Sequence, residues 1–201
     1  MAYYKEIVDV IDDAIVAGAL TDSRFQNRAF AGLCFLVPCK INDTNVSAMI
    51  PAKVSTVGEC NFIVPDDTFN LVTYHRVLST IYRPSISQYG DGTDYIDATA
   101  DMVLTVISFT DKLRIQPENV EALFISGFPT SFSSALKESL QLRSLNAIIT
   151  ASSFDQVAIF NSEYRGETYF LKPGTVIFQI RYQIIQSFKK DCFTICCEAE
   201  A

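Results

Sequence analysis

Five ionisable side chains could carry chemistry in this sequence: His75, Asp91, Asp94, Asp97 and Asp101. A histidine next to carboxylates suits general acid–base catalysis, so a small intracellular enzyme that uses His75 and these aspartates is one interpretation. Four closely spaced aspartates also suggest a calcium loop. An EF-hand, however, needs ligands at fixed positions and a glutamate at the twelfth, and this stretch has neither. Aspartate and glycine are also what an exposed turn uses, so we expect a turn here and a structural role for His75.

The remaining candidate motifs lack the residues that their chemistry needs. Neither Ser126–Gly127 nor Ser133–Ser134 belongs to the GxSxG pattern that exposes a serine nucleophile. The run Gly90–Asp91–Gly92 lacks the lysine and the spacing of a phosphate-binding loop. We therefore predict no catalytic residue and no cofactor, and we expect the protein not to be an enzyme.

The cysteines are expected to be free thiols. The chain begins MAYYKEIVDV, without the basic and apolar regions of a secretory signal, and no apolar run reaches the roughly 18 residues of a membrane span. Synthesis in a reducing cytoplasm and no membrane association follow as expectations. Zinc would require CxxC-like pairs plus histidine, and His75 is the single histidine, so we predict no metal site. The cysteines are Cys34, Cys39, Cys60, Cys192, Cys196 and Cys197.

Composition bears on the kind of partner. The net charge is −7, and the longest basic run is Lys189–Lys190, which argues against sequence-specific nucleic-acid binding. Apolar residues make up 49% of the chain, whereas charged residues make up 19% against about 25% in typical globular proteins. Either the core is large, or some apolar surface faces another subunit.

A long β-hairpin organises the predicted fold. Val72–Ser87 and Tyr95–Phe109 are extended segments on either side of a Gly–Asp turn cluster. Residues 102–109 are apolar on both alternating faces, as expected of a central strand covered on both sides. Pro117 suits the first position of a following helix, which Gly127 and Pro129 end.

The other elements follow from periodicity and composition. Tyr3–Leu20 has apolar residues at helical spacing, and Ser133–Leu142 favours a second, shorter helix. Arg28–Val37 is a compact apolar run that indicates one buried strand. Thr175–Phe188 alternates as a strand, and Leu145–Ile159 is expected to be extended.

Residues 38–70 differ in texture, with three prolines and several Asn and Asp residues between short apolar runs. This pattern predicts an inserted arm or flap of short strands, although a meander on the edge of the main sheet is the alternative. Apolar residues in this arm, residues at the hairpin tip and residues near the C-terminus are the candidates for subunit contacts. They are Val46, Met49, Ile50, Phe62, Ile63, Tyr89, Asp91, Asp94, Tyr95, Phe193 and Ile195.

The order of these elements resembles that of tail-terminator or tail-completion proteins of tailed bacteriophages, such as a neck-ring protein of a crAss-like phage. The resemblance covers Tyr3–Val37 and Leu71–Phe188 and rests on the order of elements rather than on a motif. It implies an α+β fold with a mostly antiparallel (mixed) sheet and helices packed on one face. Residues 1–201 would form a single domain with 38–70 inserted.

The same resemblance implies a structural virion protein made in the host cytoplasm. Such a subunit forms a homo-oligomeric ring at the head–tail junction and contacts other neck, tail or portal-side proteins. A ring needs two complementary surfaces on each copy, which exposed strand edges or an arm would supply. The second alternative to an enzyme is an adaptor that pairs a free strand edge with a peptide.

Overall fold

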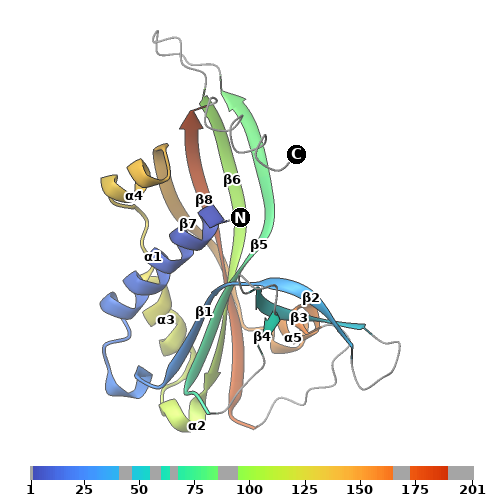
Figure 1. Ribbon diagram of the computed structural model, residues 1–201. Coiled ribbons are helices and arrows are strands. Elements are labelled where there is room, and N and C mark those ends of the chain that lie inside the picture. Colours follow the sequence, from blue (N-terminus) through green and yellow to red (C-terminus); the bar gives the residue numbers. More distant parts are fainter. Residues whose placement is uncertain are drawn as a thin grey trace. The chain divides into compact units, whose positions relative to one another are not determined.

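The computed structural model describes residues 2–40, 47–54, 60–63, 68–85, 95–164 and 173–189. After α1 and η1 the chain forms a run of strands, then a group of helices, and then two strands separated by a helix (Figure 1). The helices are α1 (Ala2–Gly18), η1 (Ser23–Phe25), α2 (Thr110–Leu113), α3 (Pro117–Gly127), α4 (Ser134–Ser139) and α5 (Gln156–Glu163). The strands are β1 (Arg28–Leu33), β2 (Phe35–Lys40), β3 (Ser47–Val54), β4 (Cys60–Phe62), β5 (Leu71–Ser85), β6 (Tyr95–Phe109), β7 (Leu142–Ser153) and β8 (Thr175–Lys189).

Five of the strands form a mixed sheet in the order β1-β5-β6-β8-β7, and β2, β3 and β4 form a smaller sheet. β1 pairs with β5 in parallel, with Arg28 opposite Leu71. The arrowheads show that β6 runs opposite to its neighbours β5 and β8, and that β7 runs opposite to β8 (Figure 1). The predicted α+β class with a mixed, mostly antiparallel sheet is confirmed, as are the two long strands of the hairpin.

The chain divides into two compact units. The first comprises Met1–Arg76, Val103–Phe128 and Ala151–Ile180, and the second comprises Val77–Met102, Pro129–Thr150 and Arg181–Ala201. Strands β5, β6, β7 and β8 contribute residues to both units. In the part of the chain that the structure describes, no helix is both long and apolar enough to cross a membrane.

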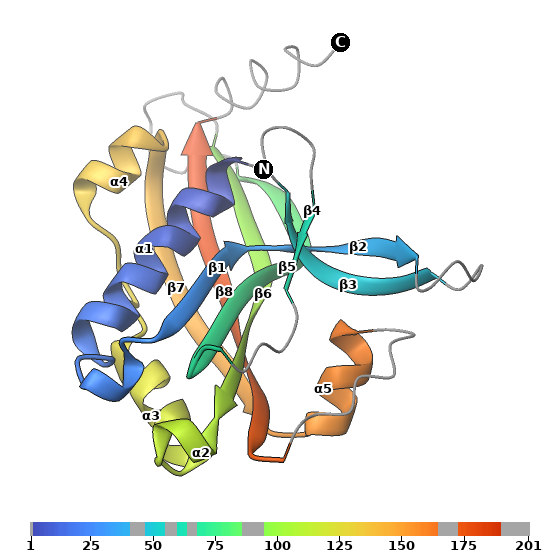
Figure 2. The same ribbon diagram turned by 60° about the horizontal axis from the view of Figure 1, so that its bottom comes forward.

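In the first unit, α1 and α3 cover one face of the sheet (Figure 2). The predicted apolar stripe of α1 is fully buried at Ile7, Val8, Ile11 and Ile15, because it packs inward. Glu6 and Asp13 face out, whereas Asp12 is buried. The rings of Phe124 on α3 and Phe178 on β8 meet edge to face, with centroids 6.1 Å apart. This aromatic contact fixes α3 on the sheet.

Gly127, at the end of α3, lets α3 approach α1 closely. A Cβ atom at this position would lie 2.9 Å from the Cβ atom of Ala19 and 3.1 Å from the backbone Cα atom of Ile15. Backbone atoms cannot move aside as a flexible side chain does. At Gly18, by contrast, an added Cβ atom would meet only the Cα atom of Gly127, at an ordinary 3.7 Å.

We therefore expect Gly127→Ala to lower the free energy of unfolding by about 1–3 kcal/mol, the usual cost of inserting a methyl group into a tight contact. Gly18→Ala is the matched control. It should be neutral or slightly stabilising, because alanine restricts the unfolded chain and favours the helix. Urea unfolding followed by circular dichroism measures both variants. Equal midpoints for the two variants would contradict the close approach of α1 and α3.

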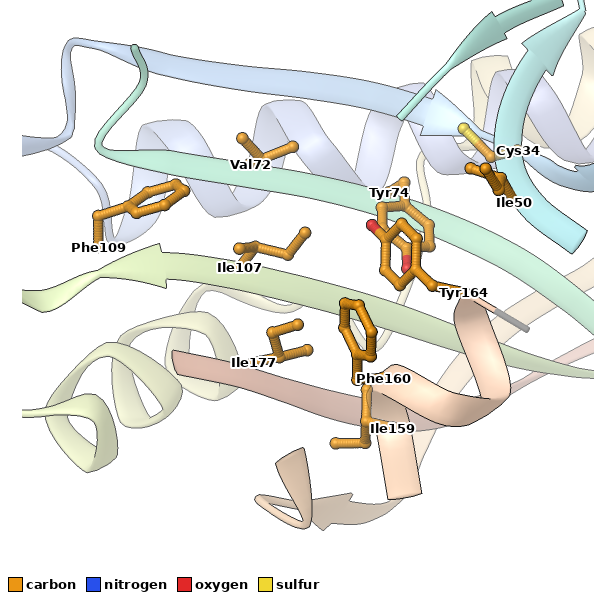
Figure 3. Packing of buried hydrophobic residues seen from close by; sticks show 10 residues of the cluster. All are labelled: Cys34, Ile50, Val72, Tyr74, Ile107, Phe109, Ile159, Phe160, Tyr164 and Ile177. Carbon is orange, nitrogen blue, oxygen red and sulfur yellow. The ribbon is translucent and has the colours of Figure 1, made fainter. Parts of the chain in front are cut away.

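The other face of the sheet in the first unit carries α5 and residues of the smaller sheet (Figure 3). Leu145–Ile159 was expected to be extended throughout, yet β7 ends at Ser153 and α5 starts at Gln156. The carboxylate of Asp155 accepts a hydrogen bond from the backbone N–H of Ala158 and caps this helix. The buried cluster beneath α5 contains Cys34, Ile50, Val72, Tyr74, Ile107, Phe109, Ile159, Phe160, Tyr164 and Ile177.

The apolar run Arg28–Val37 is two strands rather than the single predicted one. β1 ends at Leu33 and β2 begins at Phe35 in the smaller sheet. Gly32 has φ +70°, a conformation that glycine adopts without strain, and the register of β1 with β5 shifts between Phe30 and Leu33. Uniform hydrophobicity hides such a break, because both halves are buried or half-buried. β2 then pairs with β3 in antiparallel register from Phe35 to Lys40.

In the second unit, the sheet buries one face and leaves the other open. Along residues 98–102 of β6 and 181–186 of β8 the even-numbered residues are buried and the odd-numbered ones are exposed or half-buried, and the pattern ends at the buried Ser187. This alternation is typical of a sheet with one covered face. The buried even-numbered residues are Ala98, Ala100, Met102, Tyr182, Ile184 and Gln186.

Candidate functional site

A buried carboxylate, Glu163 at the end of α5, is the centre of the largest polar cluster that the structure describes. Its side chain is about 1% exposed. Arg76 on β5 binds it through both Nε, 2.7 Å from Oε2, and Nη2, which donates to Oε1. The Nε2 atom of Gln179 on β8 lies 2.9 Å from Oε1, and the hydroxyl of Tyr74 lies 3.2 Å from Oε2.

Four donors therefore converge on the two oxygens of Glu163. A bidentate guanidinium is the strongest partner that a carboxylate finds in proteins, and it compensates the burial of the charge. Gln179 also donates from Nε2 to the hydroxyl of Thr105 on β6, at 3.0 Å. The cluster thus ties α5 to three neighbouring strands of the sheet.

Tyr74, which donates to Glu163, is fully buried, and Figure 3 shows its ring next to that of Tyr164. Burial raises the pKa of its phenol well above the ordinary value, and the nearby Tyr164 and Glu163 raise this pKa further. A phenol held neutral in this way donates a hydrogen bond but does not act as a base at physiological pH. The cluster is suited to locking α5 in place, because its acceptors are occupied and its groups are shielded from solvent.

His75 lies on β5 and is fully buried. Its Nε2 atom is 2.9 Å from Oδ1 of Asp12 on α1, which is also buried. The enzyme hypothesis paired His75 with the hairpin carboxylates, but the structure gives it a carboxylate from the first helix. Because the two groups lie on α1 and β5, this buried hydrogen bond connects α1 to the sheet.

Cys34 sits between β1 and β2 and is a free, fully buried cysteine. Burial raises the pKa of its thiol to about 12. The thiolate is the nucleophile in cysteine chemistry, and about one thiol in ten thousand is ionised four units below its pKa. Cys34 is therefore a packing residue. The side chains of the other five cysteines lie outside the described residues.

We expect Cys34 to resist alkylation by iodoacetamide at pH 8 in the folded protein and to react readily in concentrated urea, where its pKa returns to the ordinary range. Peptide mass spectrometry after timed quenching measures its rate separately from those of the other cysteines. Equal rates for Cys34 in the folded and unfolded chain would show that the site opens to solvent.

The hairpin carboxylates have separate environments. Asp101, in the second unit, accepts hydrogen bonds from the hydroxyl of Ser79 at 2.7 Å and from Nε2 of Gln183 at 2.8 Å. These two bonds lower the pKa of Asp101. Asp97 is exposed on the same strand, whereas Asp91 and Asp94 lie outside the described residues. Among the described residues, no three histidine, cysteine or acidic side chains gather as metal ligands would.

The residues predicted for subunit contacts lie in different environments. Ile50 is 4% exposed and Ile63 packs against the same buried cluster, so both serve the interior of the chain instead of a contact surface. Met49 and Tyr95 are half-buried, and the guanidinium of Arg143 lies 4.7 Å from the centre of the Tyr95 ring. The side chain of Phe62, and residues Val46, Tyr89, Asp91, Asp94, Phe193 and Ile195 as a whole, lie outside the described residues.

A surface that sequence reasoning missed lies on β5 in the second unit. Leu78 is 46% exposed, and Ile81 and Tyr82 are each 49% exposed. The sequence does contain a signal for this surface, because residues 77–82 read VLSTIY and carry no charge. Strand edges are usually protected by charged residues or proline, and this stretch has neither.

Comparisons with known proteins do not show which family this chain belongs to. No protein-family model matches the sequence, and no curated protein matches it.

Proposed function

We propose that this protein is a structural, ring-forming subunit of a tailed-phage virion, placed at the head–tail junction, where it connects tail or portal-side proteins. The observation that carries the proposal is the exposed apolar stretch of β5 at Leu78, Ile81 and Tyr82. The stretch Val77–Tyr82 carries no charge between Arg76 and Arg83, and a strand segment with this much exposed apolar surface is suited to a protein partner.

Two further observations support an assembly role over an enzymatic one. The most reactive types of side chain, Cys34, His75 and Glu163, are buried, and the latter two are held by partners that connect helices to the sheet. The elements on which the phage resemblance rests are also present: α1, the β5–β6 hairpin, α3 and β8 follow in the expected order.

Light scattering of the purified chain, with negative-stain imaging of the same fraction, tests the proposal. We expect closed rings with a central opening, and peptides of this chain in purified virions of the phage that encodes it. A chain that stays monomeric at high concentration and is absent from virions would refute it. A monomer that binds extended peptides would favour the adaptor instead.

A further inference from the structure

The second unit contains a four-stranded part of the sheet with two edges. Its strands lie in the order β5, β6, β8 and β7, so β5 forms one edge and β7 forms the other. The last residue of β5 in register with β1 is His75, opposite Leu33. Beyond Arg76, no described strand pairs with the outer side of β5 (Figure 1).

In the part of the second unit that the structure describes, no strand pairs with the outer side of β7 after Ala147. The backbone N–H of Ala147 donates to the carbonyl of Thr130, and Ser131 forms a bridge with Asn146. This short segment covers the middle of the edge. Ile148, which is 49% exposed, and the exposed Thr150 follow it. From Ser144 to Thr150 the sequence SLNAIIT carries no charge, and on β5 the stretch Val77–Tyr82 carries none before Arg83 and Pro84, so these two stretches lack the charges that usually protect strand edges.

The directions of the strands make these two edges complementary. The four strands alternate in direction, so β5 and β7 run opposite to each other (Figure 1). When identical copies are placed side by side in the same orientation, β7 of one copy runs antiparallel to β5 of the next. Antiparallel pairing of these edges would satisfy backbone groups on both and cover Leu78, Ile81 and Ile148.

We propose that β5 of one copy, over Val77–Tyr82, pairs in an antiparallel manner with the last residues of β7 in the second unit, Ile148–Thr150, of a second copy. This head-to-tail contact uses a different surface on each partner. Each copy therefore binds one neighbour through its β5 edge and the other neighbour through its β7 edge. Repetition of such a contact closes into a ring when the rotation per copy divides a full turn. The inference rests on the proposed function and identifies the contact that builds the ring.

Edge-blocking variants test the pairing in the full-length chain. Ile81→Lys places a charge on the β5 edge, and Ile148→Lys places one on the β7 edge. Both positions are half exposed, so folding should be retained, and Leu78→Lys is a second variant for β5. Val157→Lys, at a 72% exposed position on α5, is the control for the loss of an exposed apolar side chain.

We expect each edge variant to raise the concentration needed for assembly by about tenfold or more, equivalent to about 1.4 kcal/mol per contact, while Val157→Lys leaves it unchanged. The decisive sample is an equal mixture of Ile81→Lys and Ile148→Lys. One copy then retains an intact β7 edge and the other an intact β5 edge, so the mixture should form a dimer of twice the monomer mass and stop there.

Each other outcome has a distinct meaning. If Ile148→Lys still dimerises with itself while Ile81→Lys does not, β5 pairs with β5 about a two-fold axis, and the head-to-tail contact is refuted. If both edge variants form rings like the unmodified chain, the ring-forming function stands and the edge assignment fails. An unmodified chain that never assembles overturns both.

Discussion

Glu163→Gln is expected to lower the free energy of unfolding by about 3 kcal/mol or more. The substitution keeps the shape of the side chain, so no cavity contributes to the loss. It replaces a carboxylate that accepts from four donors with an amide that has one acceptor oxygen. Arg76 is then left in a half-buried position without an opposite charge, which is the costly consequence of breaking such a pair. Urea unfolding at neutral pH measures the loss.

A matched control separates burial from charge. Lys5 and Asp9 form an ion pair one turn apart on the outer face of α1, with both side chains about half exposed. Lys5→Ala should change the stability by about 0.5 kcal/mol or less, as exposed pairs usually do. A similar small effect for Glu163→Gln would mean that the cluster does not hold α5 on the sheet.

A double-mutant cycle tests whether Arg76 is the main partner. Arg76→Met removes the guanidinium and keeps much of its apolar length. In the Glu163→Gln background this change should cost far less than it does alone, because the pair has already been broken. Strictly additive losses would show that the two residues contribute independently.

The sequence predicted the long elements well, because their patterns are local. The stripe of α1, the proline at the start of α3 and the doubly apolar strand at residues 102–109 each carry their own signal. The structure confirms these elements with their expected burial. Such features follow from periodicity and from the geometry of helix ends.

Other features depended on contacts between distant residues. α5 has little amphipathic character, because it packs through Ile159, Phe160 and Tyr164 near one end. Asp155, as a capping residue before it, was the available signal. The break between β1 and β2 depends on Gly32, and a single glycine in an apolar run does not reveal whether two sheets share it.

The polar clusters were predicted least well. Glu163 comes together with Tyr74, Arg76 and Gln179 across up to 89 residues of sequence. Asp12 meets His75 across 63 residues. No rule of sequence spacing links such residues. A single sequence therefore does not show that these polar side chains are buried together. The exposure of Leu78, Ile81 and Tyr82 was not predicted either, because it depends on the order of the strands, which places this uncharged stretch of β5 at an edge.

Asp12→Ala is expected to destabilise the chain by about 1–3 kcal/mol, because it leaves the buried His75 without its carboxylate partner and weakens the link between α1 and the sheet. Asp13→Ala is the matched control. Asp13 is the neighbouring residue on the same helix but is exposed, so the gain in helix propensity is the same and the lost contact is absent. Its stability should stay within about 0.5 kcal/mol of the unmodified protein.

Asp12→Asn separates the hydrogen bond from the charge. Asparagine retains an oxygen that can accept from a protonated Nε2 of His75, so this variant should recover most of the stability that Asp12→Ala loses. If Asp12→Asn is instead as unstable as Asp12→Ala, the contact with His75 requires the negative charge of Asp12 and not only an acceptor oxygen. Equal stability of Asp12→Ala and Asp13→Ala would contradict any role for the pair in holding α1.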